Sequence, residues 1–230
     1  MIAGYAAGEH GAREAAREGA AIVVVAAFLA NTTIVVLVRK GARVIPVASI
    51  EEAAAYTGAD YRIGERGSVK VRGFDFDNSP TEIEVAELPP GATVVLSTNG
   101  TRIIEAARGA EILAGTFVNA PAVADELATG AYGGRVAVVG CGWEGRRASE
   151  DESAAGAILY RLREWGIGLD EWARRVVDLY LARSKESLRR NSVARRLTRL
   201  GYEQDLDFCL AEITVPVVPR FEGDAFVSRR

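Results

Sequence analysis

Residues 135–162 read RVAVVGCGWEGRRASEDESAAGAILYRL, in which an apolar strand is followed by a small polar turn and then by a helix. The same order recurs in residues 92–107, ATVVLSTNGTRIIEAA, and in residues 110–127, AEILAGTFVNAPAVADEL. Strands that alternate with helices in this way are typical of a largely parallel sheet with helices on both faces. The pattern predicts an α/β fold, a three-layer α/β/α sandwich with a largely parallel or mixed sheet.

The N-terminal part of the chain extends this pattern. Residues 21–25 are a β-branched run, as expected of a strand that is buried on both faces. A helix is predicted to follow through Lys40, with Gly41 closing it, and residues 42–48 form the next predicted strand. The first twenty residues, rich in Ala, Gly, Glu and Arg, are predicted to hold a short helix or strand before the core begins.

The C-terminal part is mostly helical. We predict a helical subregion over about residues 167–205 and interpret residues 213–219, ITVPVVP, as an edge strand. No linker separates this region from the rest, so residues 1–230 are predicted to form a single domain. Dimerisation through the helical tail is a further hypothesis.

Composition argues against several classes of protein. The chain has 230 residues, 49% of them hydrophobic, and a formal net charge of −3, which allows a large core but provides no basic field for nucleic acid. The arginine-dense segment 183–199 is interpreted as a solvated amphipathic helix pair. Cys141 and Cys209 form no CxxC or zinc-site spacing, and two cysteines do not make a disulfide scaffold, so a cytoplasmic location, which is reducing, is expected. Polar residues interrupt the apolar segment 22–38, so no membrane partner is expected.

Three of the predicted strand-to-helix turns carry an asparagine: Asn31, Asn99 and Asn119. In open α/β sheets, ligands bind beyond the carboxyl ends of the strands, where helix N-termini point free N–H groups outward. The turns are therefore predicted to form a cradle for phosphate or another oxyanion. The small polar residues beside the asparagines are Thr32, Thr33, Thr98, Gly100 and Thr101. Asparagine is also a good helix N-cap, so a structural role for each stays open.

Residues 64–82, GERGSVKVRGFDFDNSPTE, have many charges and turn-formers and few residues to bury. Carboxylates such as these bind Mg²⁺ in many proteins, and the guanidinium of Arg66 can form a bidentate hydrogen bond with an anionic group. These carboxylates are Glu65, Asp75, Asp77 and Glu82. Asn78 and Ser79 resemble a helix cap before Pro80. For a second acidic pair, Glu150 and Asp151, the favoured interpretation from the pair alone is a helix-dipole effect in a first turn.

The absence of familiar catalytic motifs argues against several reaction mechanisms. The chain has no GxxxxGK[ST] loop and no G-x-S-x-G elbow, and its one histidine, His10, lies outside the core pattern. A phosphohistidine intermediate and a Ser-His triad are therefore disfavoured. Cleavage of a phosphate ester would need a carboxylate nucleophile or a water activated by Mg²⁺.

Several short motifs, in order from about Ile22 to Pro219, resemble the 2-phosphosulfolactate phosphatase family. The motifs are GERG at 64–67, GFDFDNSP at 73–80, STNGT at 97–101, GTFVNAPAVA at 115–124, the CG…SEDE…AGAI series at 141–158, and NSVARRL and DFCLAE in the tail. The resemblance implies an α/β/α sandwich and a Mg²⁺-dependent acid phosphatase. Family members hydrolyse (R)-2-phospho-3-sulfolactate to sulfolactate in coenzyme M biosynthesis.

The chain departs from the family pattern at the end of its first long strand. Ala26 stands where the family has aspartate, and Leu29 where it has arginine. Asp77 and Ser68 each occupy a position where the family tends to have glycine. Loss of an Asp/Arg pair removes a metal ligand or nucleophile together with an anion clamp. Asp77 could replace the missing carboxylate.

Three hypotheses follow. The leading one is a Mg²⁺-dependent phosphatase of small anionic phosphoesters, the second a homologue that binds a small anion without turnover, and the third an assembly subunit whose polar turns are only caps. For the first, the predicted catalytic and metal-binding residues are Glu65, Asp75 and Asp151. The predicted substrate-binding residues are Asn31, Thr32, Thr33, Arg66, Asn78, Ser79, Thr98, Asn99, Gly100, Asn119 and Gly142. Arg102, Arg146 and Arg147 are candidates for the sulfonate end.

Overall fold

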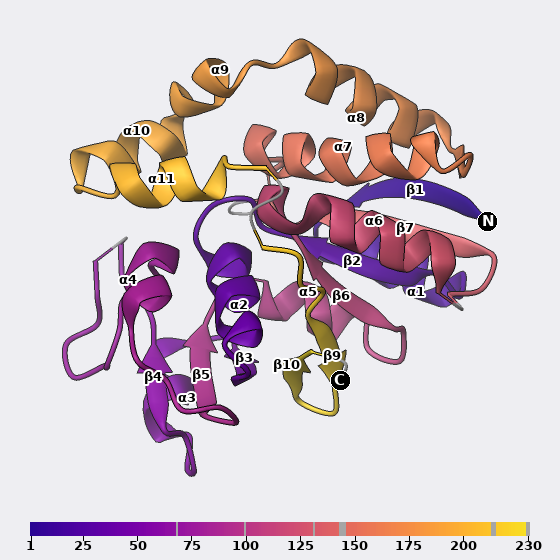
Figure 1. Cartoon of the computed structure of the whole chain (residues 1–230). Helices are drawn as coiled ribbons and strands as arrows, with labels where there is room; N and C mark the ends of the chain where they lie inside the picture. The colour runs from indigo at the N-terminus through magenta and orange to yellow at the C-terminus, as the bar shows by residue number, and fades with distance from the viewer. Residues whose placement is uncertain (68, 99, 131, 143–145, 213–214, 229–230) are drawn as a thin grey trace.

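A ten-stranded mixed sheet runs through the computed structural model, with helices on both faces (Figure 1). The structure describes residues 1–230 except 68, 99, 131, 143–145, 213–214 and 229–230. The strand order is β4-β5-β3-β10-β9-β6-β2-β7-β1-β8, and the strands are parallel except for β9 and β10. The predicted three-layer α/β/α sandwich is confirmed.

The elements have the following bounds. The strands are β1 Ile2–Ala7, β2 Ala21–Val25, β3 Arg43–Val47, β4 Tyr61–Ile63, β5 Thr93–Ser97, β6 Ile112–Gly115, β7 Arg135–Gly140, β8 Gly168–Leu169, β9 Arg220–Glu222 and β10 Ala225–Val227. The first helices are α1 Gly8–Arg17, α2 Ala30–Arg39, α3 Ile50–Ala55, α4 Pro80–Val85 and α5 Thr101–Ala106. A 3₁₀ turn, η1 Phe117–Asn119, precedes α6 Ala120–Thr129 and α7 Ser149–Glu164. The tail holds α8 Glu171–Ala182, α9 Lys185–Arg189, α10 Ser192–Arg199 and α11 Glu203–Cys209.

The N-terminal predictions agree with these elements. Residues 21–25 form β2, which is buried along its whole length and lies between two parallel strands, β6 and β7. Helix α2 ends at Arg39, and Gly41 follows with φ +83°, a conformation that glycine adopts without strain. The first twenty residues hold both a strand, β1, and a helix, α1.

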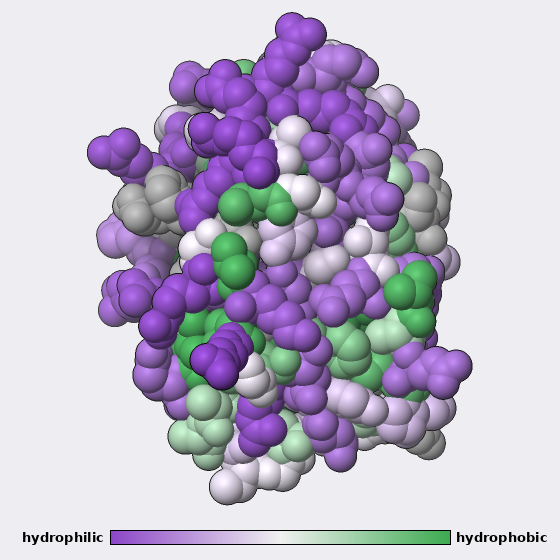
Figure 2. All heavy atoms as spheres, turned by 90° about the vertical axis from the view of Figure 1, so that its left-hand side faces the viewer, coloured by the Kyte–Doolittle hydropathy of each residue, from purple (hydrophilic) through white to green (hydrophobic). Residues whose placement is uncertain are grey.

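Four helices, α8 to α11, make up the C-terminal subregion, as the sequence predicts. In Figure 1 they run across the top of the molecule and down to α11. The side formed by α10, α11 and α4 is mainly hydrophilic, with smaller groups of hydrophobic residues between (Figure 2). Within the described part of the chain, none of the helices combines the length and the apolar character needed to cross a bilayer.

The predicted edge strand at residues 213–219 is wrong over its described part, because residues 215–219 form no strand. Pro216 and Pro219 have no N–H to donate to a ladder. A hairpin of β9 and β10 forms instead in the middle of the sheet, antiparallel to β6 on one side and β3 on the other. Gly223, with φ +67°, lies in its turn. This hairpin makes the sheet mixed.

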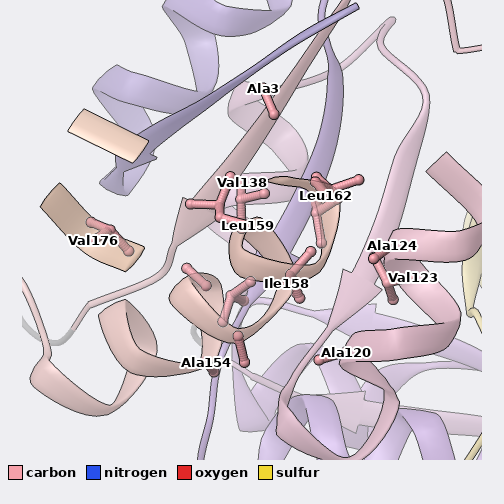
Figure 3. Close-up of a cluster of buried hydrophobic side chains, with 14 of the residues drawn as sticks. Ala3, Ala120, Val123, Ala124, Val138, Ala154, Ile158, Leu159, Leu162 and Val176 are labelled. Carbon is pink, nitrogen blue, oxygen red and sulfur yellow. The ribbon is translucent and has the colours of Figure 1, made fainter. Parts of the chain in front are cut away.

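Helix α7 packs on one face of the sheet. Ile158, Leu159 and Leu162 of this helix lie against Val138 of β7, with α6 on one side and α8 on the outside (Figure 3). The approach of α8 is close at Gly156, where a Cβ atom would lie 2.4 Å from the Cβ of Tyr180. Helices α1, α2, α4 and α5 bury their apolar residues on the opposite face. The helices cover the two faces of the sheet but not the edge at which the parallel strands have their carboxyl ends.

Candidate active site

A cavity of about 670 Å³ lies at the carboxyl ends of β2, β3, β5 and β7. Segments that follow these strands form one wall, residues 65–67 and Asn78 a second, and α10 a third. The lining residues are Ala26, Phe28, Leu29, Ala30, Ala48, Glu65, Arg66, Gly67, Asn78, Ser97, Thr98, Gly100, Cys141, Gly142, Glu150, Asp151, Ser192, Val193, Arg196, Leu197 and Arg199. The predicted convergence of strand-end turns with the 64–82 segment is therefore present.

Asp151, in the first turn of α7, is the most enclosed acidic side chain of the cavity. One carboxylate oxygen accepts the N–H of Ala27 at 2.8 Å, and the other accepts the N–H of Gly142 at 2.8 Å. These bonds tie the carboxylate to the ends of β2 and β7. Burial raises the pKa of Asp151 to about 7, and the charges of Glu150 and Glu152 add to the rise, while the two N–H bonds oppose it.

The two neighbours of Asp151 differ in their surroundings. Glu152 does not line the cavity and is neutralised by Arg147 at 2.6 Å and Arg183 at 3.3 Å. Glu150 lines the cavity, and its carboxylate accepts a hydrogen bond from Asn191 at 2.8 Å. Burial also raises the pKa of Glu150. A cation in the cavity would therefore relieve the cost of two buried carboxylates.

Asn78 contributes an unsatisfied oxygen to the same cavity. Its side chain is 5% exposed, and its Oδ1 atom has no hydrogen-bond partner among the described residues. A buried acceptor left without a partner costs about 1–3 kcal/mol, so such an atom is typical of a ligand or ion site.

Mg²⁺ fits the donors of this cavity. No group of three or more His, Cys, Asp or Glu side chains is arranged to hold a metal within the part of the chain that the structure describes. Mg²⁺ commonly uses only one or two carboxylates and completes its shell with waters and substrate phosphates. Glu150 and Asp151 supply the carboxylates, and the orphaned Oδ1 of Asn78 is a further hard oxygen.

The structure brings seven of the predicted site residues to the cavity wall. They are Glu65, Arg66, Asn78, Thr98, Gly100, Gly142 and Asp151. Glu65 is half-buried, whereas Arg66 is exposed and forms an ion pair with Glu51 at 2.7 Å. The hydroxyl of Thr98 accepts the N–H of Gly100 at 3.2 Å, which shapes the turn after β5. Asn99 and Ser68 lie outside the described residues.

Asp75 is the main correction to the predicted site. Its carboxylate is exposed, accepts the backbone N–H of Arg62 at 2.8 Å, and does not line the cavity. It therefore braces the loop after β4, away from the cavity that Glu65 lines. Loop segments without regular periodicity do not reveal from sequence which of two nearby carboxylates turns inward.

Asp77 and Ser79 are buried but also absent from the cavity wall. The Asp77 carboxylate accepts the hydroxyl of Tyr202 and the N–H of Asn78. Asp77 therefore does not replace the carboxylate expected at position 26. Ser79 caps α4, accepting the N–H of Glu82 at 3.1 Å, as the cap-like sequence predicts.

Asn31 and its two threonines belong to the core. The Nδ2 atom of Asn31 donates to the carbonyl of Val24 at 2.7 Å and to that of Gly115 at 3.2 Å, joining β2 to β6. Thr32 lies 3.3 Å from the hydroxyl of Thr116, and Thr33 is fully buried. None of the three predicted anion-binding residues lines the cavity.

Asn119 is a structural residue as well, and its replacement is expected to destabilise the fold. It is fully buried, accepts the N–H of Thr116 at 2.9 Å, and donates to Ala114 at 3.1 Å and Val217 at 2.9 Å. Asn119→Ala should lower the free energy of unfolding by about 2–4 kcal/mol. Urea denaturation followed by circular dichroism measures this change. Unchanged stability combined with weaker phosphate binding would restore the predicted anion-binding role.

Leu29, at the position where arginine was expected, has a strained backbone. It has φ 58° and ψ −77°, and Ala30 N–H donates to the carbonyl of Phe28 at 2.9 Å, which defines a γ-turn. It is the one non-glycine residue with positive φ among those described. Its N–H donates to Cys209 Sγ at 3.4 Å, and its side chain packs with Leu197. The contacts of Leu29 hold the turn against α10 and α11. A strained backbone like that of Leu29 is typical of functional loops.

The sequence reasoning missed the wall that α10 forms. Ser192, Arg196 and Arg199 line the cavity, although segment 183–199 was interpreted as a solvated surface. The helical periodicity of the segment was the available signal, but it does not show which part of the molecule the polar face of the helix contacts.

The three arginines proposed for a sulfonate lie elsewhere. Arg102 is exposed on α5 and is not part of the cavity wall. Arg147, in addition to its pairing with Glu152, lies over the ring of Trp172 at 5.1 Å. Arg146 is exposed and does not line the cavity either.

Comparison with known proteins shows similarity over nearly the whole chain. A family model described as 2-phosphosulpholactate phosphatase matches residues 9–224. A protein of Thermotoga petrophila named "Probable 2-phosphosulfolactate phosphatase" is 35% identical over 210 residues, covering 90% of this chain and 91% of the relative. Proteins with the same name from Carboxydothermus hydrogenoformans and Gloeobacter violaceus are 38% and 36% identical. The Carboxydothermus match covers 88% of this chain and 86% of the relative, and the Gloeobacter match 86% of each.

Proposed function

Because this chain belongs to the 2-phosphosulfolactate phosphatase family, we propose that it hydrolyses a small anionic phosphoester, 2-phosphosulfolactate or a close relative, with the help of Mg²⁺. The observation that carries the proposal is the cavity at the strand ends. There the buried Asp151 and Glu150 line the same cavity as Asn78, whose Oδ1 atom has no partner among the described residues. The products would be inorganic phosphate and the corresponding alcohol.

In this proposal, different side chains and backbone groups of the chain have different roles. Glu150 and Asp151 would hold Mg²⁺, with Asn78 as a further oxygen donor, and the ion when bound neutralises phosphate charge. The backbone around Gly100 and the hydroxyl of Thr98 border the space for the phosphate oxygens. The carboxylate of Asp151, fixed by the N–H groups of Ala27 and Gly142, would keep the ion and the attacking water in place.

A water, rather than a carboxylate of the chain, is the proposed nucleophile. Ala26 presents only a methyl group to the cavity, and Asp75 lies outside it. Both oxygens of Asp151 already accept backbone hydrogen bonds at 2.8 Å, which hold the carboxylate in place and lower its nucleophilicity. Ala26, at the position where the family has aspartate, therefore lines the cavity without a reactive group.

Removal of the metal is expected to abolish turnover. Purified protein should release inorganic phosphate from 2-phosphosulfolactate in the presence of Mg²⁺, and excess EDTA should stop the release until Mg²⁺ is restored. A heat-inactivated sample and the Asp151→Asn variant serve as controls for contaminating phosphatases. Metal-independent turnover would overturn the role of Mg²⁺, and absence of turnover with any divalent ion would overturn the proposed hydrolysis.

A second candidate function is anion binding without turnover. It is favoured by Ala26 and Leu29, which line the cavity where the family pattern has an aspartate and an arginine. This alternative expects phosphate or sulfolactate to raise the melting temperature of the protein while no metal supports hydrolysis. Detectable Mg²⁺-dependent turnover that Asp151→Asn removes would decide against it.

A further inference from the structure

Arg196 is a cation that lines the cavity. Its guanidinium forms no hydrogen bond or ion pair with any residue that the structure describes. The side chain is half-buried, and its Nη2 atom lies 3.6 Å from the point where Gly67 would carry a Cβ atom. Two other arginines are engaged elsewhere: Arg66 pairs with Glu51, and Arg189 pairs with Asp207. A partly enclosed guanidinium left free in this way is suited to bind an anion.

Helix α10 is held in a defined place, so Arg196 has a defined position. Leu197, its neighbour on the helix, packs against Leu29 and Leu206. The following helix, α11, is fixed by Asp205, which accepts hydrogen bonds from Ser79 at 2.8 Å and from the hydroxyl of Thr81 at 2.7 Å. The arginine therefore belongs to a wall that is bound to the rest of the site.

Helix α10 places Arg196 away from the acidic end of the cavity. Asn191, the N-cap of α10, contacts Glu150 at 2.8 Å, so the helix begins at the acidic end of the cavity. Arg196 lies five residues further on, about 7–8 Å along the helix axis at 1.5 Å per residue. The cavity thus has carboxylates at one end and a free guanidinium at the other.

We propose that Arg196 binds the second anionic group of the substrate, the sulfonate or carboxylate that is not hydrolysed, and so determines specificity for bifunctional anions. This proposal rests on the proposed phosphatase function. The guanidinium can donate two parallel hydrogen bonds to the oxygens of such a group, a geometry that lysine cannot supply. Arg199, exposed on the same helix and also lining the cavity, adds positive charge at this end.

The test compares two substrates in three variants. For Arg196→Gln, kcat/KM for 2-phosphosulfolactate should fall about 10²-fold, as expected for loss of one positioning contact, whereas kcat/KM for p-nitrophenyl phosphate should change less than about threefold. Arg196→Lys should fall between the wild type and Arg196→Gln. Arg195→Gln is the matched control, because Arg195 is exposed on the same helix and does not line the cavity. Equal losses for the two substrates, or no loss for either, would overturn the proposal.

A binding measurement separates this proposal from the proposed hydrolysis. If the wild type hydrolyses neither substrate, the hydrolytic function fails, and titration calorimetry with sulfolactate still tests Arg196. We expect the wild type and Arg195→Gln to bind sulfolactate with equal affinity and Arg196→Gln to bind it at least about tenfold more weakly. Equal affinity of all three proteins, or no binding by the wild type, would contradict the assignment.

Discussion

Asp151→Asn is expected to lower kcat for phosphate release by roughly 10³-fold or more. The substitution removes a negative charge that would hold Mg²⁺ and the carboxylate that would position the attacking water. It also replaces one of two oxygens that accept N–H groups, from Ala27 and Gly142, by an amide that cannot accept. Steady-state phosphate release at saturating Mg²⁺ measures the loss, and circular dichroism verifies that the variant is folded.

Asp75→Asn is the matched control for this prediction. Asp75 is exposed, and its carboxylate accepts the backbone N–H of Arg62 outside the cavity. The control should keep kcat within a few-fold of the wild type, the range expected for a surface residue away from the chemistry. A large loss in Asp75→Asn together with retained activity in Asp151→Asn would reverse the assignment and return the catalytic role to the 64–82 segment.

Asp205→Ala is expected to lower the free energy of unfolding by about 3–5 kcal/mol. Asp205 is 4% exposed, and one of its oxygens accepts the hydroxyl of Ser79, the N–H of Thr81 and the hydroxyl of Thr81. Loss of this carboxylate leaves buried donors without an acceptor and separates α11 from α4. Guanidinium denaturation of the wild type and the variant measures the difference.

The same helix provides the control for Asp205. Asp207 lies two residues further on, and its ion pair with Arg189 is exposed, with side-chain exposures of 60% and 42%. Asp207→Ala should change the stability by no more than about 0.5 kcal/mol, because exposed ion pairs contribute little. Equal effects of the two substitutions would mean that Asp205 does not hold the helical tail to the loop that carries Asn78.

The sequence predicts much of the sheet because the local pattern and the global fold agree there. Apolar runs such as residues 21–25 are buried on both faces, and each is followed by a helix, as parallel strands require. The same rule brings the strand-end turns to one edge, so Thr98, Gly142 and Asp151 meet in one cavity. The hairpin of β9 and β10 was missed because its place in the sheet depends on partners far away in sequence.

The site itself is only partly readable from sequence. An asparagine after a strand has the same local pattern whether it faces a ligand or, as Asn31 and Asn119 do, joins neighbouring segments through buried carbonyls. An arginine on an amphipathic helix likewise has the same pattern in solvent and at Arg196. These distinctions depend on tertiary packing, which no local spacing encodes.

The central claim is that phosphate and a divalent cation share the cavity at the strand ends. A crystal grown with Mn²⁺ in place of Mg²⁺ and with phosphate tests it most directly, because anomalous scattering identifies the metal. The account predicts an Mn²⁺ peak about 2.0–2.3 Å from a carboxylate oxygen of Asp151 or Glu150, with phosphate bound to the ion. A metal bound at Asp75, or phosphate bound outside the cavity, would contradict it.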